Sequence, residues 1–185
     1  MGTLLQFETK RLLLRPIEKS DAEAVFHYRS DARVNRYQGW IPASISDVHY
    51  FINYKVSREM NLPGTWVQFV LIHKDQNQII GDIGIHFLSA DTFQVEMGCT
   101  LDQLYHGKGY ASEALKQMIH YLFHVLDKRR IIASIDPGNE SSIQLFERLG
   151  FRKEAHFRES IYQNGQWADD LVYAILKSEW KNEFL

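Results

Sequence analysis

Apolar residues along 109–126 recur every three or four positions, which is the spacing of the buried face of an amphipathic helix. The positions concerned are Leu115, Met118, Ile119, Leu122 and Phe123. Three basic residues follow at 128–130, where the negative end of a helix favours cations. The pattern predicts a helix over 109–126 and, from the apolar run after it, a strand over 131–135.

Strand-like segments precede that helix. β-Branched and aromatic residues dominate 66–72 and 79–88, and the polar link between them suits a hairpin. Residues 93–101 have the composition of a third strand, and the three segments are predicted to form an antiparallel meander. Nearer the N-terminus, a leucine-rich strand is predicted over 11–15, ending at Pro16.

Two helices are predicted between the leucine-rich strand and the meander. The Ser20-x-x-Glu23 pattern satisfies free amides at a helix start, so one helix is expected to begin there. A second helix is expected from about Ser46 to the break at Pro63-Gly64. Its apolar face comprises Val48, Phe51, Ile52 and Val56.

The last third of the chain contains clear breaks. Residues 136–139 interrupt the strand over 131–135, and the segment 141–144 opens a short helix that Gly150 ends. Two long strands flank Asn164-Gly165, the strongest hairpin signal in the chain. An antiparallel front, one strand-helix-strand crossover and a closing hairpin predict an α+β fold, not a doubly wound parallel sheet.

Length and charge limit the kinds of protein that this chain can be. With 185 residues, of which 45% are hydrophobic, we expect a single domain spanning 1–185. A net charge of -2 gives no general attraction to nucleic acid or to an anionic membrane, so neither is expected as a partner. Glu8, Lys10 and Arg11 interrupt the apolar N-terminal stretch, so neither a signal peptide nor a membrane helix is expected.

Cysteine and histidine usage narrows the chemistry. Cys99 is the only cysteine, which excludes an internal disulfide framework and is compatible with the reducing cytoplasm, where we expect the protein. The eight histidines show no HExxH or comparable ligand spacing, so no metal is expected.

Small residues at 107, 109 and 111 mark the turn His106–Ala111, directly before the long helix. Without bulky side chains, successive backbone N–H groups can converge on an anion at the N-terminus of a helix. Phosphate is the natural occupant, although the bare pattern equally suits a tight connection. A dinucleotide-binding fold needs a third glycine where Ser112 stands, and the Gly-Lys-Ser/Thr of nucleotide hydrolases is missing.

Several short motifs occur in a fixed order along the chain. They are Thr9–Pro16 with Asp21–Glu23, Glu96–Gly98, Gly107–Ala114, Asn139 and Ser142 with Leu149–Phe151, and the tail residues Arg158, Asn164, Gly165, Trp167, Asp170, Tyr173, Glu179 and Trp180. In order and spacing they resemble the GCN5-related N-acetyltransferases, and within that family the branch of Rim-type acetyltransferases of ribosomal-protein N-termini. The resemblance spans nearly the whole chain.

The resemblance implies a mixed, mostly antiparallel central sheet, splayed beside the strand that ends at Leu101 and flanked by helices. It implies acetyl-CoA as co-substrate, with the pyrophosphate on the amides of the turn and the pantetheine against backbone near Cys99. The cofactor-binding residues so implied are Cys99, Leu101, His106, Gly107, Lys108, Gly109, Tyr110, Ala111 and Asn139. The family often has Gln or Arg where His106 stands, so anchoring is expected to rest on backbone amides.

Transfer of an acetyl group to an amine requires a proton acceptor for the amine and a proton donor for the departing thiolate. Glu96 is the candidate base, because its strand is predicted to border the gap; the alternative is an exposed glutamate paired with a lysine. Many relatives use a tyrosine as the acid where this chain has Phe146. Ser142 resembles the Rim-type serine near the sulfur, with simple helix capping as the alternative. Asn139 resembles a pantetheine-binding residue, with a turn-forming role as the alternative.

These inferences predict an N-acetyltransferase that transfers the acetyl group of acetyl-CoA to a primary amine by direct attack in a ternary complex. Covalent catalysis by Cys99 is disfavoured, since nothing nearby in sequence would produce a thiolate. The acceptor is a protein N-terminal α-amine or a small-molecule amine, and 33–42 and 158–170 are expected to line its side. We expect a monomer or homodimer. The alternatives are a non-catalytic acyl-CoA-binding sensor and an NAD-binding module.

Overall fold

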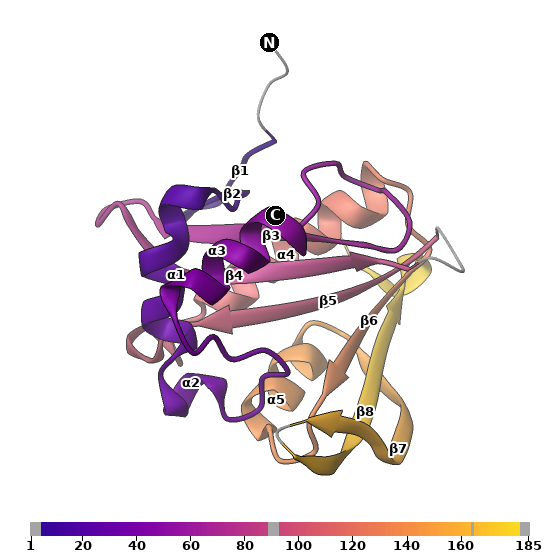
Figure 1. The fold of residues 1–185 in the computed structure, drawn as a ribbon. Helices are drawn as coiled ribbons and strands as arrows, with labels where there is room; N and C mark the ends of the chain where they lie inside the picture. Colours follow the sequence, from indigo (N-terminus) through magenta and orange to yellow (C-terminus); the bar gives the residue numbers. More distant parts are fainter. Residues whose placement is uncertain (1–4, 89–92, 164, 182–185) are drawn as a thin grey trace.

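The computed structural model describes residues 5–88, 93–163 and 165–181. Its strands form one eight-stranded sheet in the order β1-β2-β3-β4-β5-β6-β8-β7 (Figure 1). The strands are β1 (Phe7–Glu8), β2 (Leu12–Pro16), β3 (Thr65–His73), β4 (Gln78–Phe87), β5 (Gln94–Leu101), β6 (Arg130–Ile135), β7 (Arg152–Gln163) and β8 (Gln166–Leu176). The helices are α1 (Ala22–Arg29), α2 (Ala32–Asn35), α3 (Ile45–Tyr54), α4 (Tyr110–His124) and α5 (Glu140–Arg148), with 3-10 turns η1 (Lys19–Asp21), η2 (Gln103–Tyr105) and η3 (Lys177–Glu179). The predicted α+β class is confirmed.

β5 and β6 are parallel neighbours, whereas the other neighbouring strands run antiparallel. The two strands pair only where Gln94–Glu96 meets Arg130–Ile132. Beyond that point β5 continues beside β4 and β6 continues beside β8, so the two strands diverge (Figure 1). The splay implied by the resemblance is therefore present, and it opens directly after Glu96.

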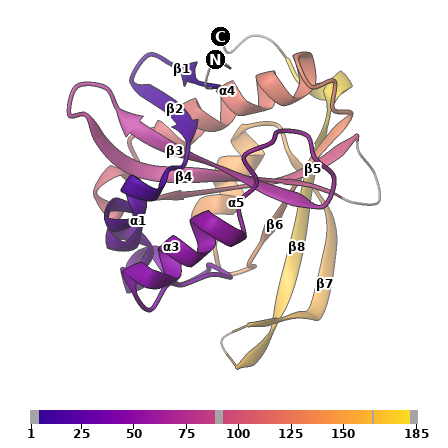
Figure 2. The same cartoon turned by 45° about the horizontal axis from the view of Figure 1, so that its top comes forward.

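The sheet is covered on both faces because successive side chains of a strand point to opposite sides. In β3, Phe69 and Leu71 belong to the core that includes the buried face of α4, whereas Val70 and Ile72 pack with α1 and α3. Figures 1 and 2 show α1 and α3 on one side of the sheet and α4 on the other. All five apolar positions predicted for the long helix are fully buried. Across the described ranges, no helix is long and apolar enough to span a membrane.

The start of the first helix differs from the prediction. The turn η1 precedes α1, and the backbone N–H of Glu18 donates to Asp21 Oδ2 over 2.7 Å. The guanidinium of Arg15 also donates to both carboxylate oxygens of Asp21, at 2.7 and 2.8 Å. The prediction of a cap at Ser20 is wrong, because the acid that Arg15 holds in place organises this helix start.

The second helix, α3, is capped by Ser44 and ends at Tyr54. Val56 therefore lies outside the helix and forms an isolated parallel bridge with Trp66. The prediction that the helix runs on to Pro63-Gly64 is wrong, because pairing with β3 takes over before that break. The short elements α2 and β1 carry no periodic pattern and are additions to the predicted fold.

The closing hairpin of β7 and β8 is present and extends beyond the body of the molecule (Figure 2). Gly165 has φ 79°, as a tight turn requires, while Asn164 lies outside the described residues. The pairing register shifts between Phe157 and Ile161, and there Glu159 has φ 47°. Asp169 Oδ1 accepts the Glu159 N–H over 2.8 Å, which stabilises this bulge.

Candidate functional site

The gap between β5 and β6 exposes backbone groups of β5. Asp102 donates its N–H to Ile80 O of β4 over 2.9 Å, so its backbone faces away from the gap. Because orientation alternates along a strand, the N–H and C=O groups of Met97, Cys99 and Leu101 face the gap. An extended arm lying in the gap can therefore pair with Cys99, as the resemblance implies for pantetheine.

The turn before α4 has a backbone conformation that favours glycine. Gly107 and Gly109 have φ of 70° and 81°, and Gly109 is the N-cap residue of α4. A Cβ at Gly107 would meet no other atom within 4 Å, so the space in front of the turn is open. The first amides of a helix have no acceptor within the helix and lie at its positive end. The turn therefore suits an anion such as a phosphate.

An ion pair from the N-terminal segment braces this turn. Arg11 Nη1 donates to Lys108 O over 2.9 Å, and its Nε donates to Glu113 Oε2 over 2.6 Å. Glu113 also accepts the Thr9 hydroxyl at 2.6 Å. Burial opposes the charge on Glu113, but these hydrogen bonds outweigh it and lower its pKa. The Arg11 guanidinium lies 4.1 Å from the ring centre of Tyr110, so the start of α4 is held from two directions.

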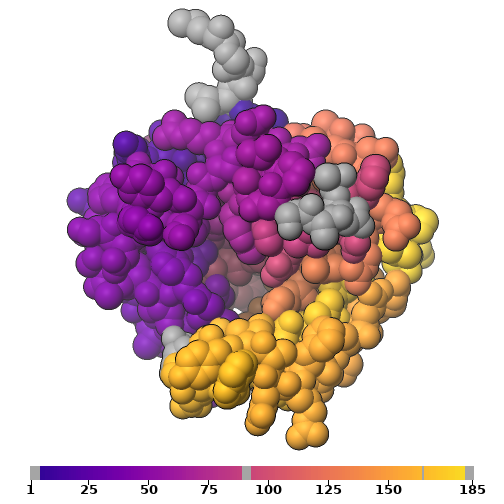
Figure 3. Space-filling model, turned by 45° about the vertical axis from the view of Figure 1, so that its right-hand side comes forward, coloured from indigo at the N-terminus to yellow at the C-terminus, as the bar shows by residue number. Residues whose placement is uncertain are grey.

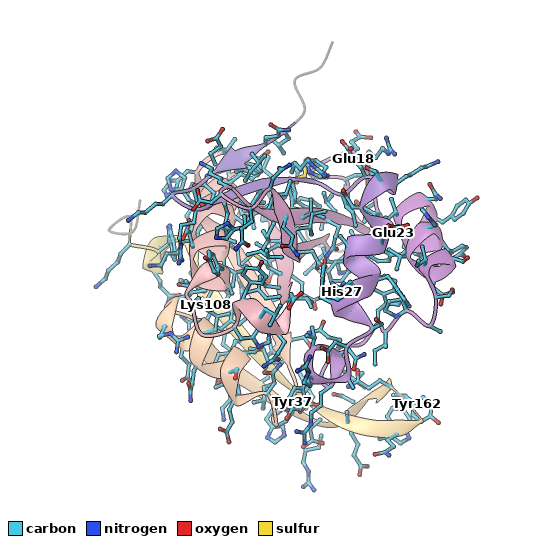
Figure 4. All side chains as sticks on the ribbon, turned by 90° about the vertical axis from the view of Figure 1, so that its left-hand side faces the viewer. Glu18, Glu23, His27, Tyr37, Lys108 and Tyr162 are labelled. Carbon is cyan, nitrogen blue, oxygen red and sulfur yellow. The ribbon has the colours of Figure 1, made fainter. Side chains whose placement is uncertain are left out.

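The side chains of the turn point in different directions. His106 Nε2 donates to Leu101 O over 2.9 Å, which occupies one backbone acceptor in the gap and leaves the Leu101 N–H. The Tyr110 ring is buried, and its hydroxyl lies 2.9 Å from His73 Nε2. Lys108 is exposed on the surface (Figure 4). An anion bound at this turn would therefore be held mainly by backbone amides.

Two cavities meet at the splay. One, of about 870 Å³, borders the start of α4 and is named here the α4 cavity; the other, of about 810 Å³, borders α3 and β7 and is named the α3 cavity. Six residues line both and form what we call the junction: Tyr37, Gln38, Cys99, Thr100, Asn139 and Ser142. Every predicted cofactor-binding residue except Lys108 lines the α4 cavity. Figure 3 shows the recess between the N-terminal half and the C-terminal strands.

Glu96 lines the α3 cavity at the last position of β5 that pairs with β6. Its Oε2 lies 3.6 Å from His86 Nδ1, so among the described residues the partner of its carboxylate is a histidine and not a lysine. Burial raises the pKa of Glu96, and the nearby His86 opposes that rise. A carboxyl group with a raised pKa is better matched to taking a proton near neutral pH.

Asn139 and Ser142 divide the roles that the sequence left open. Asn139 is the N-cap of α5, and its Oδ1 accepts the Ser142 N–H over 3.2 Å. Ser142 therefore supplies a backbone amide to the cap, and its hydroxyl forms no hydrogen bond within the described part of the chain. The side chain that caps α5 is therefore that of Asn139 and not that of Ser142. Phe146, buried further along α5, packs edge to face against Phe151 with ring centres 5.0 Å apart.

Cys99 lies next to a buried polar network. Burial, reinforced by the charge of Asp82, raises the pKa of the Cys99 thiol far above its usual range, which disfavours a thiolate. Asp82 accepts hydrogen bonds from Arg29 at 2.9 and 2.5 Å, from Tyr28 at 2.5 Å and from Gln68 at 2.6 Å. The network keeps that carboxylate satisfied beneath the α3 cavity. Over the residues described, no group of three or more His, Cys, Asp or Glu side chains could hold a metal ion.

The segment after α2 contributes residues that the sequence did not single out. Gln38 Oε1 accepts the Thr100 hydroxyl over 3.2 Å, which ties this segment to β5. A Cβ at Gly138 would lie 3.1 Å from Tyr37 Cε1, so Tyr37 closes against the turn before α5. Figure 4 shows Tyr37, which lies at the start of this segment, and Tyr162 on the outer part of the hairpin. Residues of both 33–42 and 158–170 line the α3 cavity, and residues of 33–42 also line the α4 cavity.

Comparison with known proteins agrees with this geometry. The family model of the acetyltransferase (GNAT) domain matches residues 11–152. An uncharacterized N-acetyltransferase of Bacillus subtilis (strain 168), YnaD, is 33% identical over 180 residues, covering 95% of this chain and 99% of that protein. The [ribosomal protein uS5]-alanine N-acetyltransferase of Escherichia coli (strain K12) is 27% identical over 181 residues, covering 95% of this chain and 93% of the relative.

A solved structure shares the whole architecture. The acetyltransferase (GNAT family) from Bacillus anthracis superposes with a TM-score of 0.81 at 32% identity, covering 95% of this chain and 100% of that one. The chain therefore belongs to the GNAT acetyltransferase family. It is an acetyl-transferring enzyme, and its family implies acetyl-CoA as the acetyl donor.

Proposed function

We propose that the protein transfers the acetyl group of acetyl-CoA to a primary amine by direct attack, with both substrates bound at once. The junction carries this proposal, because it is where the α4 cavity and the α3 cavity share their walls. Donor and acceptor held on either side of such a junction would meet without a covalent enzyme intermediate. The raised pKa of the Cys99 thiol supports the same route.

The residues present fit acetyl-CoA. The open turn at Gly107 and Gly109 would hold the pyrophosphate on backbone amides, and the gap-facing backbone of Cys99 would pair with the pantetheine arm. Asn139, in the junction, would contact the same arm while capping α5. Bound acetyl-CoA supplies the activated thioester whose acetyl group is transferred.

Two side chains would move protons. The Glu96 carboxylate takes a proton from the amine nitrogen, directly or through one water, as the N–C bond forms. As the C–S bond breaks, Ser142 Oγ gives its proton to the leaving sulfur and takes a proton from solvent water in return. Ser142 lines both cavities and Glu96 lines the α3 cavity, which supports a proton donor at the junction and a base on the side of the α3 cavity.

The acceptor is a protein N-terminal α-amine or a small-molecule amine. The relative from Escherichia coli is named for the alanine of ribosomal protein uS5, which supports membership of the Rim-type branch and an N-terminal acceptor. The lone cysteine supports a cytoplasmic location. A monomer or homodimer remains our prediction for the assembly.

Substitution of the proposed base tests the chemical step. Glu96→Gln should lower kcat by about a hundredfold or more, since general-base catalysis contributes factors of that order, while acetyl-CoA affinity stays within about twofold. Glu23→Gln, an exposed glutamate on α1 (Figure 4), is the matched control and should leave both unchanged. Tight acetyl-CoA binding without turnover of any amine, and no effect of Glu96→Gln, would instead support the non-catalytic sensor.

A further inference from the structure

The α3 cavity has an aromatic wall. Six aromatic residues line it: Tyr37, Trp40, Tyr50, Phe51, Trp66 and Phe146. Stacking on a neighbouring ring fixes the ring planes of two of these side chains without a ligand. Trp40 stacks on Phe51 with ring centres 4.2 Å apart, and Trp66 stacks on His86 at 4.6 Å. A preformed apolar wall of this kind suits an apolar ligand body, since little ordering is needed on binding.

Exposed apolar side chains gather at the same cavity. Ile41 is 39% exposed, Tyr50 55% and Trp66 37%, and all three line it. Large apolar groups left open to solvent within one cavity mark a binding surface. Their shared position points to a ligand that covers them.

The charges of the α3 cavity balance. Two acids, Asp47 and Glu96, and two cations, Arg29 and Lys55, line it. Arg29 is paired with Asp82, and Asp47 accepts the N–H groups before α3. Glu96 accepts no backbone N–H group among the described residues, so of the two acids it is the carboxylate that we assign to a ligand ammonium.

Lys55 lies on the side of the cavity formed by α3. It is exposed, and its Nζ lies 5.8 Å from the ring centre of Tyr50. A second ammonium on the acceptor would meet Lys55, because the other carboxylate of the described lining, Asp47, already accepts two backbone N–H groups through Oδ2. Repulsion between Lys55 and a second ligand ammonium would disfavour a ligand with two ammonium groups. Repulsion of competing ligands is one way in which a binding site gains specificity.

We propose that the acceptor carries a single ammonium on an apolar or aromatic body, and that Lys55 discriminates against polyamines. This inference rests on the proposed function, which supplies the amine. The ammonium lies at Glu96, and the body lies along the aromatic wall. A free aryl- or alkylamine and a peptide with an apolar first residue share this chemistry.

A pair of amines that differ only in the second charge provides the test. For n-hexylamine, kcat/KM should exceed that for 1,6-diaminohexane by about fivefold, the scale of one solvent-screened charge contact at close range. Phenethylamine and a peptide beginning with phenylalanine distinguish a small acceptor from a peptide. Equal or better use of the diamine, or of spermidine, overturns the inference.

Reversing the charge at Lys55 tests its role. Lys55→Glu should raise kcat/KM for the diamine several-fold and close most of the gap to n-hexylamine. Arg58→Glu makes the same charge change on a nearby exposed residue outside the lining, and should leave the gap unchanged. An equal effect of both variants would mean that general charge and not the cavity sets the preference, which overturns the role of Lys55.

Binding separates this inference from the proposed function. The two amines are titrated by calorimetry into the protein saturated with CoA, so that their ranking needs no turnover. Preference for n-hexylamine in binding with no acetylation of any amine supports the inference and refutes the catalytic proposal. Acetylation with preference for the diamine does the reverse.

Discussion

His86 of β4 is the cross-strand partner of Glu96 in β5, and its Nδ1 lies 3.6 Å from Glu96 Oε2. Stacking on Trp66 fixes the imidazole plane, at a ring-centre distance of 4.6 Å. Burial raises the pKa of Glu96, His86 opposes the rise, and the charge of Asp170 adds to it. The pKa of the proposed base is therefore raised mainly by burial, and a neighbour on the adjacent strand limits the rise.

Removal of His86 should move the pH profile. A base works only when deprotonated, so kcat/KM falls as pH drops through the pKa of Glu96. In His86→Leu the opposing effect is lost and that pKa rises further, so the acid limb of the profile moves to higher pH. Above the limb the rate should stay within about twofold, and stopped-time assays across pH measure both.

His49→Leu is the control, because His49 is an exposed histidine of α3 outside both cavities. It should leave the acid limb in place. An acid limb that does not move in His86→Leu would contradict the coupling of His86 to the base.

Ser142 and Asn139 can be separated by measuring stability and rate together. Ser142→Ala keeps the backbone N–H that Asn139 caps, so the free energy of unfolding should change by no more than about 0.5 kcal/mol. Its kcat should fall by about a hundredfold if the hydroxyl protonates the leaving group. Asn139→Ala removes the cap and should cost about 1 kcal/mol in urea unfolding. A Ser142→Ala enzyme with full kcat would remove the serine from the mechanism.

Most of the fold was predictable because burial in its elements follows local spacing. Leu115 and Met118 are buried as the helical period requires. The same rule wrongly places Val56 in the helix. Val56 has helical spacing, but the chain has already left α3 and Val56 bridges Trp66. Ser20 fails as a cap for a related reason, since the choice of Asp21 depends on Arg15 from β2. Contacts between elements decide such boundaries.

The candidate site was predictable to a similar extent. The glycine turn and Glu96 are marked by short motifs, whereas Tyr37 and Gln38 lie in a segment with no periodic pattern. What places Gln38 is its hydrogen bond to Thr100, a residue far along the chain. An aromatic and polar run in a loop is the signal that could have marked this segment, since loops on a rigid scaffold often carry binding residues.

The glycine turn predicts a loss of donor affinity on substitution. Gly109→Glu places bulk and negative charge at the anion site, so the Kd for acetyl-CoA should rise by about a hundredfold or more, as two like charges at close range imply. Gly165→Glu introduces the same side chain at nearly the same φ, 79° against 81°, on the hairpin outside the α4 cavity. Calorimetry with acetyl-CoA should find that control unaffected, and an unchanged Kd in folded Gly109→Glu would refute the phosphate site.

The brace formed by Arg11 and Glu113 should make stability depend on pH. Because the folded-state pKa of Glu113 is lowered, its contribution is present above the unfolded pKa and is lost as pH falls through the folded pKa. Glu113→Gln should therefore lower the free energy of unfolding by about 1–3 kcal/mol at pH 7, with the difference shrinking below about pH 4.5. Urea unfolding at both pH values measures it, with Glu23→Gln as control. A difference that stays constant with pH would contradict an ionic brace.

The junction also has a kinetic consequence. Since each cavity keeps walls that the other lacks, an occupant of one leaves most of the other's surface accessible. Neither substrate has to leave before its counterpart arrives. Initial-velocity plots should accordingly intersect and not run parallel, and free CoA should compete with the acetyl donor while leaving the amine site open.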